Sequence, residues 1–178
     1  MEVKTDSKGT NATRQLVNDY AFENFKSGLN CAECVYDALI RSGALQVDPN
    51  TRAMAIGFGG GIGLCGFTCG ALSAAIMANG IVYGRPDPWR IDPEVRGEEI
   101  AAKHYRRYNK LVHDFRKANN GVLCKDICAQ YKNWHSTDRR KMCMKLIAAA
   151  ATMAYDYLQI TQEEAFILPY GENMGGLE

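Results

Sequence analysis

Apolar residues recur with a helical period along nearly the whole chain. The first clear case is Val17, Tyr20, Ala21, Asn24 and Phe25, which occupy positions i, i+3, i+4, i+7 and i+8 and are apolar with one exception. This spacing predicts a helix, and the glycine at position 28 is a typical helix stop.

The same pattern continues towards the carboxyl terminus. We expect further helical segments at Cys31–Ser42, at Cys69–Tyr83, at Glu94–Ala118, at Lys125–Tyr131 as one or two turns, and at Asp138–Leu158. A new element begins at Asp48-Pro49, and the prolines of residues 84–93 predict a loop. No segment alternates with the period of two that strands need. The sequence therefore predicts an all-α bundle of five or more helices with a glycine-rich turn.

The length of 178 residues predicts a single helical, cysteine-rich domain over residues 1–160, followed by a tail over residues 161–178 that is either docked or loose. Hydrophobic residues make up 47% and charged residues 23%, as in ordinary globular proteins. The formal net charge of +1 gives no bulk attraction to nucleic acid or to anionic lipid, so we expect neither as a partner.

Membrane and secretory segments are also not predicted. No apolar run reaches the roughly 18 residues of a membrane span, and the first twenty residues contain no apolar stretch typical of a secretory leader. An odd number of cysteines without such a leader favours a reducing compartment, and we expect the cytoplasm.

Seven cysteines carry the strongest chemical signal. Six of them form three close pairs, Cys31/Cys34, Cys65/Cys69 and Cys124/Cys128, and Cys143 stands alone. A spacing of three or four residues places both thiols of a pair on one face of a helix. Several such pairs are typical of a soft-metal or iron–sulfur site, or of a set of exchangeable disulfides. All seven are candidate metal ligands, and His135 is a candidate supplementary ligand.

A glycine run precedes Cys65 and Cys69. Residues 61–66 fit the pattern G-x-G-x-x-G, but a dinucleotide fingerprint needs a preceding strand and a βαβ unit, which this sequence lacks. We instead expect Gly59, Gly60, Gly61 and Gly63 to wrap closely around a cofactor and direct N–H groups at sulfur, because glycine tolerates positive φ. A tight helix–helix crossing is the alternative.

These residues also resemble a known family. The run Asn30-Cys31-Ala32-Glu33, the glycines of residues 57–63, Cys69-Gly70-Ala71 and Tyr83-Gly84 are similar to the C_GCAxxG_C_C family of redox-active proteins over roughly residues 30–158. The resemblance implies a small, mostly helical redox protein whose four family cysteines are Cys31, Cys69, Cys124 and Cys143. It also implies a relation to split-Soret cytochromes, whose fold hosts metal cofactors. Ala74 replaces the last glycine of the motif, and Cys34, Cys65 and Cys128 are additions to it.

Three functions compete for the cysteines. Because an iron–sulfur cluster takes four thiolates, we favour an electron-transfer protein with one or two clusters of the [4Fe-4S] type. A metal-free thiol–disulfide protein or sensor is the first alternative, and a structural zinc protein is the second. C-type haem is excluded, because C-x-x-C-H does not occur. The redox partner protein is not identifiable, a homodimer is one assembly that the apolar helices allow, and whether the protein is an oxidoreductase stays open.

Overall fold

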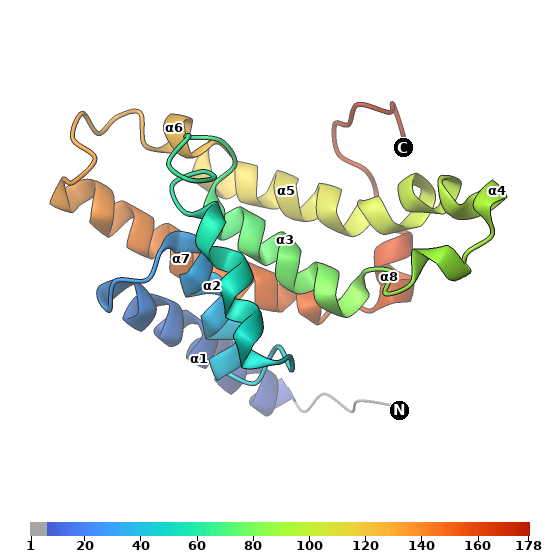
Figure 1. Ribbon diagram of the computed structural model, residues 1–178, viewed down its shortest axis with the longest axis horizontal. Coiled ribbons are helices and arrows are strands. Elements are labelled where there is room, and N and C mark those ends of the chain that lie inside the picture. The colour runs from blue at the N-terminus through green and yellow to red at the C-terminus, as the bar shows by residue number, and fades with distance from the viewer. Residues whose placement is uncertain (1–6) are drawn as a thin grey trace.

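The protein folds as an all-α bundle, which confirms the predicted class (Figure 1). The computed structural model describes residues 7–178. The expectation of no secretory leader rests partly on residues 1–6, which lie outside the described residues. The long helices are α1 Ser7–Lys26, α2 Cys31–Arg41, α3 Gly70–Tyr83, α5 Tyr105–Asn119 and α7 Thr137–Leu158. The short ones are η1 Pro49–Phe58, η2 Pro88–Arg90, α4 Pro93–Arg96, η3 Ile100–His104, α6 Cys124–Ile127 and α8 Gln162–Phe166.

The start of α2 is fixed by a capping box. The Asn30 side chain accepts the N–H groups of Ala32 and Glu33 at 2.9 and 3.1 Å, and the Glu33 carboxylate accepts the N–H of Asn30 at 2.9 Å. This reciprocal cap begins the helix at Cys31, as the sequence predicts. It therefore fixes the place of the first cysteine.

The predicted single helix over residues 94–118 is wrong, because the chain forms α4, a wide π-turn η3 and then α5. The carbonyl of Arg96, which a continuous helix would use for the N–H of Ile100, accepts Arg85 Nη1 at 2.9 Å. The N–H of Ile100 turns to Gly97 instead. Glycine and a competing side-chain donor together end the helix.

The centre of the bundle is built from small residues. Helix α3 packs against α2 and α7, and its alanines at positions 71, 74, 75 and 78 are buried. Alanines at positions 148, 150, 151 and 154 are buried on α7. Small side chains allow the helix axes to approach closely. Ala74, where the family motif has glycine, lies fully within this core.

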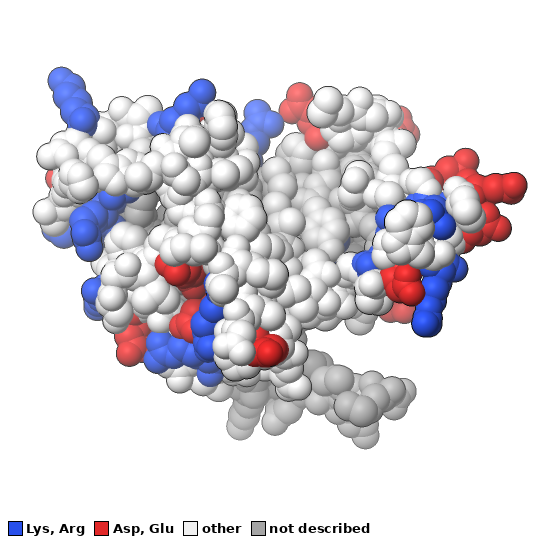
Figure 2. Space-filling view, in the orientation of Figure 1, with Lys and Arg blue, Asp and Glu red and all other residues white. Residues whose placement is uncertain are grey.

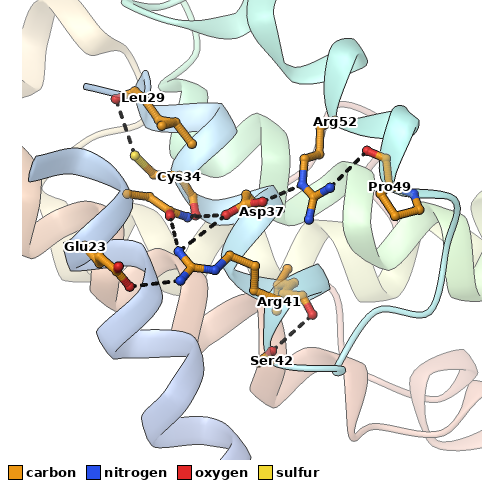
Figure 3. A network of polar contacts seen from close by, with 10 residues as sticks. Glu23, Leu29, Cys34, Asp37, Arg41, Ser42, Pro49 and Arg52 are labelled. Atoms are coloured by element: carbon orange, nitrogen blue, oxygen red, sulfur yellow. Dashed lines mark hydrogen bonds and ion pairs between the residues drawn. The ribbon is translucent and has the colours of Figure 1, made fainter. Parts of the chain in front are cut away.

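A buried carboxylate joins the amino-terminal helices (Figure 3). Asp37 of α2 accepts Asn24 Nδ2 of α1 at 2.8 Å and the Nε of Arg52 from η1. Arg41 lies 4.0 Å away and bonds Asn24 Oδ1 at 2.8 Å. Because each polar group of this network has a partner, the network fixes the orientation of α1, α2 and η1 rather than exposing a reactive acid.

The carboxyl-terminal segment lies against α5 (Figure 1). Arg106 donates to the carbonyls of Leu168 and Glu178 at 2.8 and 3.0 Å, and His113 Nε2 lies 2.8 Å from the carbonyl of Glu172. Within residues 7–178, none of the helices combines the length and the apolar character that crossing a membrane requires.

An apolar groove of about 740 Å³ lies between η1, α3 and α5. In the view of Figure 2, charged side chains gather towards the left and right ends and along the lower edge, and the centre of the face carries few. A homodimer stays a prediction, and this apolar groove is one surface on which a second copy could pack.

The end of α7 depends on a buried guanidinium. Arg107 is 2% exposed and donates to the carbonyls of Tyr157, Ile160 and Thr161 at 2.5, 2.8 and 2.9 Å. It also lies 3.7 Å from the centre of the Tyr83 ring. The side chain thus supplies a further donor to each of three carbonyls where α7 ends, two of which also accept backbone N–H groups.

We expect Arg107→Met to lower the free energy of unfolding by about 2 to 4 kcal/mol, because it removes three hydrogen bonds made by a charged donor. Urea unfolding followed by circular dichroism measures the change. Arg90→Met is the matched control, since that side chain is 87% exposed, and it should change the value by less than about 0.5 kcal/mol. Equal effects of the two substitutions would contradict the assignment.

Candidate functional site

Five cysteines from four elements line one cavity of about 430 Å³. Cys31 begins α2, Cys69 is the residue before α3, Cys124 and Cys128 bound α6, and Cys143 lies in the first half of α7. In Figure 1 these parts of the chain meet at the end of the bundle opposite α4. Segments more than a hundred residues apart therefore contribute to one site.

A short backbone pairing brings two of these elements together. The N–H of Cys69 donates to the carbonyl of Val122 at 2.8 Å, and the N–H of Cys124 donates to that of Phe67 at 2.7 Å. An isolated antiparallel bridge joins Thr68 and Leu123 between them. The pairing places Cys69 and Cys124 next to each other, although 55 positions separate them.

Two glycines are required for this approach. A Cβ at Gly70 would lie 2.6 Å from Cys31 Sγ and 2.5 Å from the Phe58 carbonyl. Gly61 has φ +73°, and a Cβ there would lie 2.7 Å from Cys124 Cβ. A side chain at either position would push a cysteine away from the cavity.

The predicted cofactor-binding glycines divide into two groups. Gly59, Gly60 and Gly63 line the cavity, whereas Gly61 lies behind Cys124. Their loop was expected to direct N–H groups at sulfur. The six N–H groups of residues 62–67 donate instead to backbone carbonyls, at 2.9 to 3.2 Å. Much of the loop's hydrogen bonding thus serves its own fold.

The remaining wall of the cavity is mostly apolar. It contains Phe25, Ile56, Leu64, Trp134, Leu146 and Ile147, with Asn30 and one cation, Arg139. Leu64 is 71% and Trp134 is 40% exposed, so the cavity opens to the surface beside these two side chains. Its occupant would lie in a largely apolar environment close to solvent.

Burial raises the pKa of three of the cavity thiols. The pKa of Cys69 is raised to about 12, mainly by desolvation and to a smaller extent by the neighbouring Cys31 thiol. Hydrogen bonds from the N–H groups of Ala71 and Leu72, at the start of α3, lower this pKa but do not offset the increase. Desolvation, followed by the Cys128 thiol, likewise raises the pKa of both Cys124 and Cys143 to about 12. The predicted stabilisation of a thiolate at a helix start is present but is smaller than the cost of burial.

Cys34 and Cys65 lie away from the cavity. Cys34 is fully buried, and its thiol donates to the Leu29 carbonyl at 3.4 Å (Figure 3). Cys65 is exposed, with its sulfur 3.9 Å from the Gly63 carbonyl. His135, the expected supplementary ligand, is exposed and does not line the cavity. The structure therefore brings together five of the seven predicted cysteine ligands.

Two residues of the cavity wall, Arg139 and Trp134, are not among the predicted site residues. Arg139 lies four residues before Cys143, a spacing that places both on one face of a helix, so the signal was present. The position of Trp134 depends on a loop and gave no such signal.

The thiols surround the cavity rather than a single point. In the described part of the chain, no three His, Cys, Asp or Glu side chains are gathered as ligands of one metal ion. A single zinc ion needs its sulfur ligands at about 2.3 Å, so the side chains would have to move to bind one.

Comparison with known protein families matches residues 29–157 to the family described as "Putative redox-active protein (C_GCAxxG_C_C)". The chain belongs to the C_GCAxxG_C_C family. An uncharacterized protein of Archaeoglobus fulgidus is 29% identical over 133 residues, covering 73% of this chain and 85% of that protein. No solved structure matches the chain. The four cysteines that the family resemblance identifies, Cys31, Cys69, Cys124 and Cys143, all line the cavity.

Thiol accessibility gives a first prediction for the metal-free protein. We expect Cys65 to react first with iodoacetamide and Cys34 last, because Cys65 is exposed and Cys34 has no accessible surface. Mass spectrometry of peptides after timed labelling measures the order. Cys65→Ser should remove the fastest phase and leave the others unchanged. Labelling of Cys34 as rapid as that of Cys65 would contradict the structure.

Alkaline stability gives a second prediction. Desolvation, followed by the nearby Cys31 thiol, raises the pKa of Cys34 to about 12, against about 8.5 in an unfolded chain. Between these values the unfolded chain releases a proton that the native protein retains. The free energy of unfolding should therefore fall as pH rises, by up to about 1.4 kcal/mol per pH unit for this thiol. Urea unfolding of metal-free Cys34→Val should show a shallower dependence than wild type, and an unchanged slope would contradict the assignment.

Proposed function

We propose that the protein binds one iron–sulfur cluster in the cysteine-lined cavity and transfers electrons. The observation that carries the proposal is the convergence of five thiols from four elements on one cavity of about 430 Å³. Membership of a family described as redox-active supports the same conclusion.

The donor set has the right chemistry for such a cluster. Iron–sulfur clusters take four cysteine thiolates, and Cys31, Cys69, Cys124 and Cys143 are the residues that we propose as ligands. Cys128 is the fifth thiol and lies beside two of them. When bound, the cluster supplies a site that stores and releases single electrons. Five thiols suffice for one cluster of the [4Fe-4S] type, and we do not extend the proposal to a second.

The surroundings of the cavity favour a negatively charged occupant. Helices α2 and α3, of 11 and 14 residues, both begin at the cavity, and the positive ends of their dipoles favour negative charge there. Apolar side chains limit the access of water, while the opening beside Leu64 and Trp134 keeps the site near the surface. A redox partner protein, as yet unidentified, would exchange electrons through this opening. The cytoplasm remains the proposed location.

Metal-free thiol–disulfide chemistry is the second candidate. One observation favours it, because the Cys128 thiol interacts with both the Cys124 and the Cys143 thiols. By exchange with the disulfide of a partner protein, two neighbouring thiols would form a disulfide there, and the partner's disulfide would take up the two electrons and two protons and become two thiols. Metal content distinguishes the candidates, since this chemistry needs no iron.

We expect protein purified without oxygen, or reconstituted with iron and sulfide, to be brown and to contain iron and acid-labile sulfide. Cys31→Ser, Cys69→Ser, Cys124→Ser and Cys143→Ser should each lose most of both, because each removes a proposed ligand. Cys34→Ser and Cys65→Ser are matched controls and should retain the wild-type amounts, because these thiols lie outside the cavity. A colourless wild type would contradict the proposal, as would a Cys65→Ser variant that loses iron like the others.

A further inference from the structure

Arg139 is a buried cation in the wall of the cysteine cavity. It is 9% exposed, and no ion pair joins it to a carboxylate among residues 7–178 whose side chains are described. Its Nη1 donates to Cys143 Sγ at 3.6 Å, and its Nε donates to the Trp134 carbonyl. Its guanidinium carbon lies 3.8 Å from the centre of the Trp134 ring. These contacts hold the guanidinium in one orientation.

Arg139 differs from Arg107 in its hydrogen-bond partners. Both guanidinium groups are buried and lie over an aromatic ring, but Arg107 donates to three backbone carbonyls. Arg139 has one carbonyl partner and directs another donor to a sulfur atom of the cavity. A buried charge without an opposite charge is costly. Negative charge held by the cysteines would supply the missing counter-charge.

We propose that Arg139 is a positioning residue that sets the reduction potential of the cluster held by the cavity. This inference rests on the proposed function. A hydrogen bond to a ligating cysteine sulfur and a nearby positive charge both stabilise the more negative, reduced form of a cluster. Among the described residues that line the cavity, Arg139 is the one cation, so its removal has no direct substitute there.

The test is the midpoint potential of the reconstituted protein, measured by redox titration followed by absorption and electron paramagnetic resonance. We expect Arg139→Gln to shift the potential to more negative values, with a change of about tenfold in the ratio of oxidised to reduced protein at a fixed solution potential, or ~59 mV for one electron. Arg139→Lys should fall between Arg139→Gln and wild type, because lysine keeps the charge but not the planar fork.

Lys141→Gln is the matched control. It makes the same change of charge on the same helix at an exposed position outside the cavity, and it should leave the potential unchanged. Iron content and circular dichroism of each variant show whether the site and the fold are intact. If Arg139→Gln fails to hold the cluster, Arg139→Lys carries the test alone.

An Arg139 variant with a bound cluster and the wild-type potential would overturn the inference while leaving the proposed function intact. Loss of the cluster from both Arg139 variants would also overturn it, because Arg139 would then be needed to build the site rather than to tune it. Absence of iron and sulfide from the wild type would instead contradict the proposed function itself.

Discussion

The cavity depends on one short backbone pairing between residues 66–69 and residues 122–125. Three hydrogen bonds of 2.7 to 3.0 Å join these segments, and they place Cys69 beside Cys124. The approach is close enough that a Cβ at Gly66 would lie 3.0 Å from Lys125 Cβ. Glycine suits this position because the backbone has positive φ and a side chain would crowd Lys125. Without this pairing, α6 and its two cysteines would have no fixed position against α3.

The contacts that stabilise the bundle lie away from the five thiols of the cavity. Arg107 satisfies carbonyls at the far end of α7, and Asp37 joins α1, α2 and η1 through Asn24 and Arg52. The alanine faces of α3 and α7 supply close packing between them. This separation lets one end of the bundle hold several thiols, a cation and a cavity, which are all unfavourable for folding on their own. Such local cost at one end is typical of a functional site.

Much of the site could be predicted from the cysteine spacing, but not all of it. A residue three positions further along a helix is rotated by about 60°, so two cysteines with this spacing share only a broad face. Cys31 therefore faces the cavity, whereas Cys34 is buried with its thiol bonded to Leu29. In the second pair, Cys65 lies in the glycine loop rather than on a helix, so the helical spacing rule did not apply to it. The four family cysteines and Cys128 do share the cavity.

The sequence by itself determined the all-α class, the beginning of α2 at Cys31 and the approximate bounds of α3 and α7. It could do so because helical periodicity, capping residues and glycine stops act over only a few residues. The tertiary structure alone decided that the predicted helix over residues 94–118 breaks, that Arg139 is buried beside Cys143, and that five thiols share one cavity. Each of these outcomes depends on contacts between segments that are distant in the chain. Such contacts compete with local conformational preference, and the sequence of a single segment does not reveal them.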